Sequence, residues 1–197
     1  MSKQVGPRGC LVGLGSVVLI FVVFGVGLHL LERWERSEPA AAVPPDLCAV
    51  IGPELFERAV PFGERMPAAS YSGDSDAACE FHTADNHPIG VDEYGNLKVR
   101  LLRYGRIWWI SGADQASKAL ASWCDGSAMM GSFVPGAGLG DESCNADGDD
   151  GETAASSVVV RRGADLIWVD HYRHPASASD TRRTVREVVA ATLAATR

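Results

Sequence analysis

One apolar stretch near the N-terminus constrains this chain more than any other feature. Residues 11–31, LVGLGSVVLIFVVFGVGLHLL, contain no Asp, Glu, Lys or Arg. A helix over this stretch is about 31 Å long at about 1.5 Å per residue, which matches a bilayer hydrocarbon core of about 30 Å. A helix also satisfies its own backbone hydrogen bonds in lipid. The sequence therefore predicts a single transmembrane helix, Leu11–Leu31, with the lipid bilayer as its partner.

The flanks of this helix bear on its orientation. Two basic residues lie on each side, so the count of Lys and Arg does not decide between the two orientations. A basic start and the four cysteines after the helix favour a cytoplasmic N-terminus, residues 1–10, and an extracytoplasmic C-terminal part. Residues 40–42 (AAA) offer a signal-peptidase-like site, but the apolar run exceeds the roughly 7–15 residues of a signal peptide. We therefore expect an uncleaved single-pass anchor in the plasma membrane.

The rest of the chain has the length of one ordinary domain. Lys3 and Arg8 are the only formally charged residues before residue 32, so residues 32–197 carry a formal charge of −9, against −7 for the whole chain. A domain this acidic lacks the basic face that nucleic-acid binding requires, and we expect no nucleic-acid partner. Residues 32–45, which include EPAAAVPP, read as a Pro/Ala linker, and residues 46–197 as the extracytoplasmic domain.

Apolar periodicity predicts an α+β fold for this domain. The segments with helical spacing are 46–60, which Pro53 interrupts, 114–130 and 179–196. The segments with strand-like alternation are 77–83, 96–104, 154–161 and 165–173, the last two forming a hairpin. Strands in runs between helices favour an antiparallel sheet with helices packed on one face. We expect Asp114 to cap the middle helix and residues 144–152 to form an acidic loop.

The cysteines carry the most informative chemistry. Cys48, Cys79, Cys124 and Cys144 all follow the apolar segment, and an even number in an exported domain indicates two disulfides. Four cysteines allow three pairings, and their spacing does not choose among them. We favour Cys48–Cys79 and Cys124–Cys144. A zinc site is the alternative, but the sequence has no C-x-x-C motif and its histidines are not at zinc-finger spacing. We expect no metal and no other cofactor.

Catalytic motifs are not visible in the sequence. It contains neither G-x-S-x-G nor H-E-x-x-H, and its glycines at 136, 138 and 140 predict a tight turn rather than a phosphate-binding loop. We expect no catalytic residues. The candidate ligand-binding residues are Trp108 and Trp109, one of which we expect in the core and the other on the surface. An exposed tryptophan beside a groove could bind an apolar ligand.

Three further groups were weighed as metal sites. His171 and His174 lie three residues apart on a predicted strand, so they should point to opposite faces and not share an ion. His82 and His87 flank a loop with acidic neighbours and could form a surface metal site or a pH-sensitive site. The run 145–152 is acidic, but it lacks the glycine at position six and the carboxylate at position twelve of an EF-hand.

Several short motifs together carry a family resemblance. They are DLCAVIGPELF around Cys48, CEF at Cys79, the helix at 114–130, GLGDE at 138–142, the hairpin SVVVRRGADLIWV and the closing helix. With these motifs the domain resembles a family of actinobacterial cell-envelope proteins grouped as a domain of unknown function, many of them lipoproteins. It is also similar in outline to the extracellular sensor domains of mycobacterial receptor serine/threonine kinases. This chain departs from the family in having a predicted spanning helix and no lipoprotein cysteine.

The resemblance implies an envelope-exposed α+β domain without catalytic residues. We therefore expect a non-catalytic, membrane-anchored domain that binds a ligand or a protein partner of the cell envelope, as a sensor or an assembly factor. The alternative is an envelope enzyme that acts on a cell-wall or lipid substrate. His82 or His171 within hydrogen-bond reach of both a carboxylate and a serine would favour that alternative.

Overall fold

The computed structural model describes residues 22, 25–27, 38–86, 88, 92–128, 131–136 and 138–196. The chain divides into two compact units, Met1–Glu38 and Pro39–Arg197. In the first unit, Val22 and residues 25–27 are helical, and the rest of the predicted transmembrane segment lies outside the described residues. Among the residues that are described, no helix combines the length and the apolar character needed to cross a membrane.

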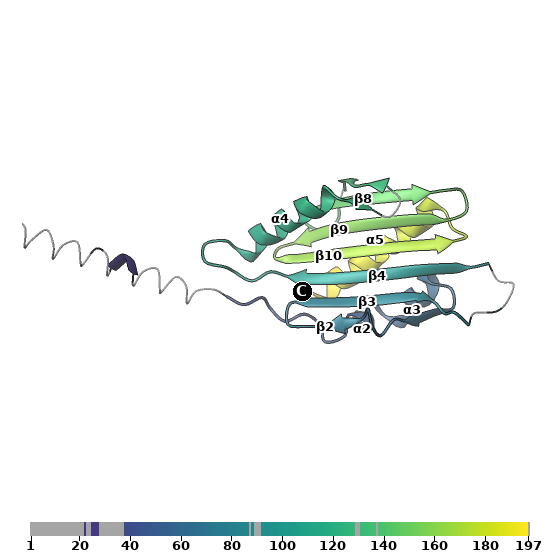
Figure 1. Cartoon of the computed structure of the whole chain (residues 1–197), viewed down its shortest axis with the longest axis horizontal. Coiled ribbons are helices and arrows are strands. Elements are labelled where there is room, and N and C mark those ends of the chain that lie inside the picture. The colour runs from purple at the N-terminus through teal and green to yellow at the C-terminus, as the bar shows by residue number, and fades with distance from the viewer. Residues whose placement is uncertain are drawn as a thin grey trace, which may run out of the picture. The chain divides into compact units, whose positions relative to one another are not determined.

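The second unit is built on one antiparallel sheet of eight strands (Figure 1). The strand order is β1-β3-β4-β10-β9-β8-β7, and β2 pairs with β3 outside this path. The strands are β1 (Gly63–Arg65), β2 (Tyr71–Ser72), β3 (Asp76–Thr83), β4 (Tyr94–Arg103), β7 (Val134–Pro135), β8 (Glu142–Asp149), β9 (Ala154–Arg162) and β10 (Asp165–His174). A separate small pair consists of β5 (Ser127–Ala128) and β6 (Gly131–Ser132). The helices of this unit are α2 (Leu47–Ile51), α3 (Pro53–Ala59), α4 (Gly112–Cys124) and α5 (Ala178–Ala195).

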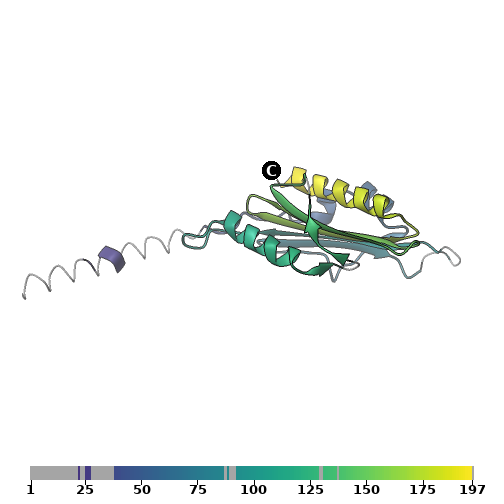
Figure 2. The same cartoon turned by 90° about the horizontal axis from the view of Figure 1, so that it is seen from above.

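Helices cover both faces of the sheet (Figure 2). Val158 and Val160 of β9 and Ile167 of β10 belong to the core beneath α2, α3 and α5. Val159 and Leu166, which alternate with them, belong to a second core beneath α4. The predicted α+β fold with an antiparallel sheet is confirmed. The expectation that the helices share one face is wrong for α4, because β9 and β10 are apolar on both faces and each face needs cover.

Two disulfides fasten helices to the sheet, one for each face. Cys48 in α2 is bonded to Cys79 in β3, with their Cα atoms 5.2 Å apart. Cys124, the last residue of α4, is bonded to Cys144 in β8, with their Cα atoms 5.9 Å apart. This is the pairing favoured from the sequence. The first bridge belongs to the core beneath α5 and the second to the core beneath α4.

The opening of the domain follows its sequence signals closely. The Asp46 side chain accepts hydrogen bonds from the backbone nitrogens of Cys48 (2.9 Å) and Ala49 (3.3 Å), so it caps α2. Gly52, at φ 87°, ends this helix, and Pro53 begins α3. A positive φ is cheap for glycine, and proline suits a first helical position, which explains the break. The sequence left two short helices and one kinked helix open for residues 46–60, and the structure has two short helices.

The middle helix begins and ends at residues other than those expected. Ser111 is its cap: the Ser111 hydroxyl accepts from the Asp114 backbone nitrogen (3.1 Å), and the Asp114 carboxylate accepts from the Ser111 backbone nitrogen (3.4 Å). Asp114 is therefore the return partner of a capping box rather than the cap. The helix ends at Cys124, ahead of Gly126, a residue with low helix propensity.

The segment predicted as an acidic loop is mostly strand β8. Cys144 and Ala146 are buried, while Asn145 and Asp147, which alternate with them, are partly exposed, and this is the two-residue period of a strand. The polar composition of this segment hid that alternation. Its prediction as a loop was wrong for residues 144–149.

The hairpin and the closing helix appear where the sequence placed them. In the β9–β10 pair, Val160 lies opposite Ile167, and Val158 lies opposite Val169. The buried residues of α5 are Thr181, Val185, Val188, Val189 and Thr192. The helix packs across β9 and β10 and contacts α2, so it forms the centre of one layer.

The domain has two ends with different connections (Figure 1). Residues 39–43, the β4–α4 loop and the β9–β10 turn lie at one end, which we call the proximal end. The β3–β4, β8–β9 and β10–α5 connections lie at the other, the distal end. Hydrogen bonds define the proximal end: Arg103, which ends β4, donates to the Ala42 carbonyl, and the Tyr104 backbone nitrogen donates to the Ala164 carbonyl at 3.0 Å.

Candidate functional site

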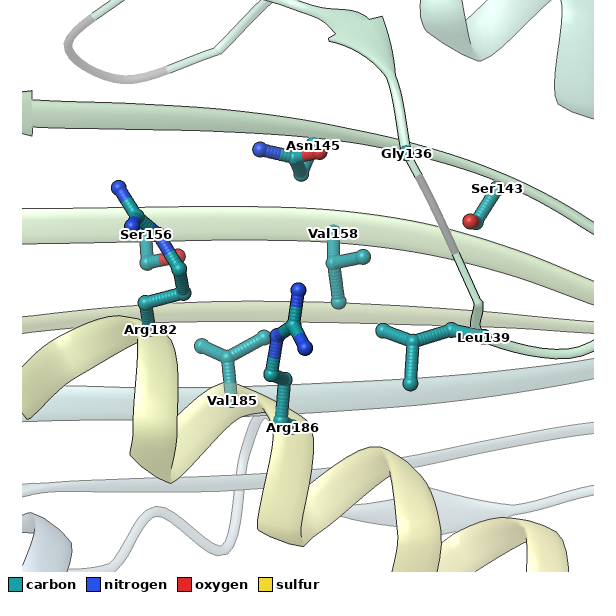
Figure 3. A pocket seen from close by; sticks show the side chains of 9 residues that line it. All are labelled: Gly136, Leu139, Ser143, Asn145, Ser156, Val158, Arg182, Val185 and Arg186. Carbon is teal, nitrogen blue, oxygen red and sulfur yellow. The ribbon is translucent and has the colours of Figure 1, made fainter. Parts of the chain in front are cut away.

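A small cavity with both polar and apolar lining, which we call the notch, lies between α5 and the β7–β8 edge of the sheet (Figure 3). Its volume is about 20 Å³. A space of this size holds about one water molecule, whereas pockets for whole small ligands measure about 300–1,000 Å³. The notch can therefore receive one small polar group of a larger partner. Its lining residues are Gly136, Leu139, Ser143, Asn145, Ser156, Val158, Arg182, Val185 and Arg186.

Asp147 lies beside the notch and ties α5 to the sheet. Its Oδ2 atom is 3.0 Å from Arg182 Nε and 2.9 Å from Arg182 Nη2. The Ser156 hydroxyl donates to its Oδ1 atom at 2.6 Å, and the Asn145 amide donates to Oδ2 at 3.3 Å. Both carboxylate oxygens are thus occupied, so this network holds α5 in place and leaves Arg182 little capacity for a ligand.

Arg186 differs from the other arginines around α5. Arg183 pairs with Asp180 at 2.8 Å, and Arg58 pairs with Glu187 at 2.8 Å. Within the described part of the chain, no carboxylate or carbonyl accepts a hydrogen bond or forms an ion pair with Arg186. Its exposed side chain rises from α5 beside the notch (Figure 3). In a strongly acidic domain, this is an uncompensated positive charge.

A larger polar cavity of about 450 Å³ lies near the start of α5. Its lining includes Arg58 and Arg173, but Arg58 is paired with Glu187, and Arg173 lies 3.6 Å from the Glu93 carboxylate. The cavity also meets His171, which is 2% exposed. The size suits a ligand, but the charges of these side chains are largely compensated within the domain.

His171 is a neutral structural residue at physiological pH. Burial lowers its pKa to about 4, although a hydrogen bond between Nδ1 and the Asn96 carbonyl (2.9 Å) acts in the opposite direction. A carbonyl can only accept, so Nδ1 carries the proton. A base with this pKa accepts protons poorly near pH 7. His171 is therefore an unsuitable general base.

Three side chains in hydrogen-bond contact at the distal end, Thr153, His174 and Asp92, form the arrangement that most resembles a catalytic site. His174 Nδ1 lies 3.2 Å from the Thr153 hydroxyl, and His174 Nε2 lies 3.3 Å from Asp92 Oδ2. The Tyr94 ring stacks on the imidazole with the ring centroids 4.9 Å apart. An open cavity of about 670 Å³ lies alongside His174 and Asp92. A hydroxyl, a base and an orienting carboxylate thus stand in sequence, as nucleophilic catalysis requires.

Two features weaken this arrangement as a catalytic site. The Asp92 side chain is 88% exposed, so water competes for the carboxylate that should orient His174. The backbone N–H groups of the neighbouring turn are already used: Gly151 donates to Asp149, and Glu152 and Thr153 donate to Asp150. These groups therefore cannot form an oxyanion hole without rearrangement.

Both candidate tryptophans are on the surface. Trp108 is 50% exposed and Trp109 is 70% exposed, so the expectation that one of them lies in the core is wrong. They occupy the tip of a tight turn whose ends, Ile107 and Ile110, exchange backbone hydrogen bonds of 3.1 and 2.9 Å. A two-residue tip leaves both side chains outside the sheet layers. None of the three cavities described above is lined by either indole.

The residues weighed as metal ligands are dispersed. Within the described ranges, no group of three or more His, Cys, Asp or Glu residues is placed to hold a metal ion. His82 lies 3.5 Å from the Glu64 carboxylate, and His87 lies outside the described residues. His171 and His174 have separate partners, as described above. In the acidic run, Asp149 and Asp150 accept hydrogen bonds from the backbone of their own turn.

Arg186 and the Thr153–His174–Asp92 arrangement were not predicted from the sequence. A signal for the first was present, because Arg182 and Arg186 are four residues apart on one side of α5, next to the buried Val185. The second joins residues separated by 21 and 82 positions, which no local pattern reveals.

Comparisons of this chain with protein-family models, with curated proteins and with solved structures found no match. The resemblance to actinobacterial envelope proteins and kinase sensor domains therefore stays a prediction.

Proposed function

We propose that this chain is a non-catalytic, membrane-anchored extracytoplasmic domain that binds an anionic group of a ligand or protein partner in the cell envelope. The observation that carries the proposal is the unpaired guanidinium of Arg186 beside the notch. The two disulfides support an oxidising, extracytoplasmic location. The apolar residues 11–31 supply the plasma-membrane anchor, with residues 1–10 in the cytoplasm.

The chemistry of this surface favours a carboxylate or a phosphate. A guanidinium forms bidentate, charge-assisted hydrogen bonds with either group. The notch beside Arg186 admits a single small polar group, so a ligand oxygen could enter it while the rest of the ligand stays outside. The formal charge of −9 after the anchor repels anions from the remaining surface. Binding is therefore confined to the basic side of α5.

A titration with defined anions tests this binding. The full-length protein in a zwitterionic detergent is titrated with inorganic phosphate and with poly-L-glutamate while its thermal unfolding is followed. A ligand that binds only the native state stabilises it by about 2.7 kcal/mol at a concentration of 100 times Kd. We expect stabilisation of the wild type and of Arg183→Gln, a matched change to a paired arginine of the same helix. Arg186→Gln should lose the response, and an undiminished response of Arg186→Gln would contradict the proposal.

Labelling of intact cells tests the location. A membrane-impermeant maleimide should modify a cysteine introduced at an exposed position of the domain, Ala190→Cys, in intact cells and without lysis, while the disulfide-bonded cysteines stay unmodified. Modification that requires lysis would place the domain in the cytoplasm and refute the location. Mass spectrometry of the modified peptides identifies the cysteines reached.

A second function, that of an envelope hydrolase, is favoured by one observation, the Thr153–His174–Asp92 chain. In this reading His174 would take the proton of the Thr153 hydroxyl, which would attack an ester or amide carbonyl; the bond to the alcohol or amine would break as that group takes the proton from His174, and water would then hydrolyse the acyl-Thr153 ester. Hydrolysis of p-nitrophenyl acetate and mass spectrometry of an acylated Thr153 test it. Activity that His174→Gln abolishes and Ser177→Ala, a change in the same cavity, leaves intact would establish the hydrolase. No activity above buffer would exclude it for this substrate class.

A further inference from the structure

The β4–α4 loop presents a rigid apolar tip to solvent. Its tip consists of Ile107, Trp108 and Trp109, all of which are at least half exposed. The two indole rings lie against each other with centroids 5.2 Å apart. Trp108 has a φ of 54°, a left-handed conformation that tryptophan rarely adopts. Backbone strain of this kind persists only where the surrounding structure enforces it, and it is concentrated at functional positions.

The base of the loop is held firmly. The Gln115 side chain donates to the Gly105 carbonyl at 2.6 Å, and the Ser111 hydroxyl caps α4 directly after the tip. Gly112 lies so close to Tyr104 that a Cβ atom would clash with the Tyr104 carbonyl oxygen. The indoles are thus presented on a fixed stem, and little side-chain or loop freedom remains to be lost on binding.

The loop lies at the proximal end, where the chain enters the domain (Figures 1 and 2). Arg103, which contacts the Ala42 carbonyl, is four residues before Ile107. Four residues of chain span at most about 14 Å. Ala42 follows Leu31, the last residue of the predicted anchor, by eleven residues, which span at most about 40 Å when extended. A linker of this length therefore allows the tip of the loop to reach the surface of the bilayer that holds the anchor.

We propose that the Ile107–Trp108–Trp109 tip inserts into the interface of the outer leaflet and docks the proximal end of the domain on the membrane. This rests on the proposed anchor. Tryptophan favours the membrane interface, because its ring is apolar while its N–H can bond to water and headgroups. The domain is too acidic for attraction to anionic headgroups to hold it there. Docking by apolar insertion leaves the notch and the distal cavities accessible to the envelope.

Fluorescence quenching by brominated lipid tests the insertion. The full-length chain is reconstituted into phosphatidylcholine vesicles with bromine on the acyl chains, in a Trp34→Phe background that removes the tryptophan predicted beside the anchor. Four tryptophans remain, of which Trp123 and Trp168 pack together beneath α4. We expect quenching of up to roughly half of the emission, insensitive to salt. The added changes Trp108→Phe and Trp109→Phe, at exposed positions that should not affect folding, should remove that quenched fraction.

The outcomes separate this proposal from the anchor on which it rests. If the protein fails to float with vesicles on a density gradient, the anchor is wrong and the docking fails with it. If the protein floats but its quenching is the same with and without Trp108 and Trp109, the anchor stands and the insertion is refuted. If the indoles become shielded only as the protein-to-lipid ratio rises, the tip packs on a second copy of the chain and lipid is not its partner.

Discussion

Acid should weaken this domain through one buried histidine. Burial holds the pKa of His171 at about 4, below its ordinary value of 6.5. Between these values the unfolded chain binds a proton that the native chain does not. The free energy of unfolding therefore falls as the pH is lowered from about 6.5 towards 4. Above the pKa of His171 in the unfolded chain, its protonation no longer lowers the stability.

The size of the effect follows from the two pKa values. With pKa values of about 4 and 6.5, protonation of the unfolded state costs the native state about 2 kcal/mol at pH 5 and almost nothing at pH 7. The loss of unfolding free energy from His171 between pH 7 and pH 5 is therefore about 2 kcal/mol. It approaches about 3 kcal/mol below pH 4, because each pKa unit corresponds to about 1.36 kcal/mol.

The variant His171→Asn isolates this contribution. Asparagine keeps an N–H group that can donate to the Asn96 carbonyl, but it does not titrate. Carboxylates with lowered pKa values, such as Asp76 beside Arg100, also make the domain less stable in acid. Burial raises the pKa of Asp170, and this contribution to stability changes with pH in the opposite direction. These contributions remain in both proteins and cancel in the comparison.

Urea unfolding of both proteins at pH 7, 6 and 5 gives the result. The wild type should lose about 2 kcal/mol more unfolding free energy than His171→Asn between pH 7 and pH 5. Equal losses would show that His171 is protonated in the native state at pH 5, and the reasoning from its burial would fail.

Three further changes test the framework of the domain. Replacing Cys124 and Cys144 by alanine should cost about 3.3 kcal/mol of unfolding free energy, because the disulfide closes a loop of 20 residues in the unfolded chain. Urea unfolding measures this loss, and the wild type with this disulfide reduced should match the variant. Gly112→Ala should cost at least about 2 kcal/mol, since its methyl group would meet the backbone of Tyr104; a thermal midpoint within error of the wild type would contradict it. Ser111→Ala should cost about 1 kcal/mol by removing the cap of α4, with a matching loss of helical circular dichroism if the first turn frays.

Local patterns predict the elements of this fold whose stabilising contacts are close in sequence. The valines of β9 and the 3.6-residue spacing in α5 are sufficient to place both elements. Strand β8 shows the limit of such patterns. It has few apolar residues besides Cys144 and Ala146, and it forms a strand because β9 and β7 pair with it on either side. Such pairing depends on tertiary context, which overrides local composition.

The position of α4 on the second face of the sheet and the candidate sites could not be predicted without the three-dimensional structure. Which face a helix covers depends on both faces of the strands beneath it, and the run Val158–Val160 is buried on both. The free guanidinium of Arg186 is recognised only after Arg182 has been assigned to Asp147. The sequence predicts Trp108 and Trp109 as candidate ligand-binding residues, because an exposed tryptophan can bind an apolar ligand, but it does not show that both are exposed together.

Each face of the sheet has its own disulfide, and the two disulfides have no helix or strand in common. One ties α2 to β3, and the other ties α4 to β8. If this protein were produced in a reducing cytosol, neither helical layer would be disulfide-bonded to the sheet, even though the strands could still pair. Recombinant production should therefore use the periplasm or another oxidising compartment. The yield of protein with both helical layers disulfide-bonded to the sheet should depend more on the redox state of that compartment than on the growth temperature.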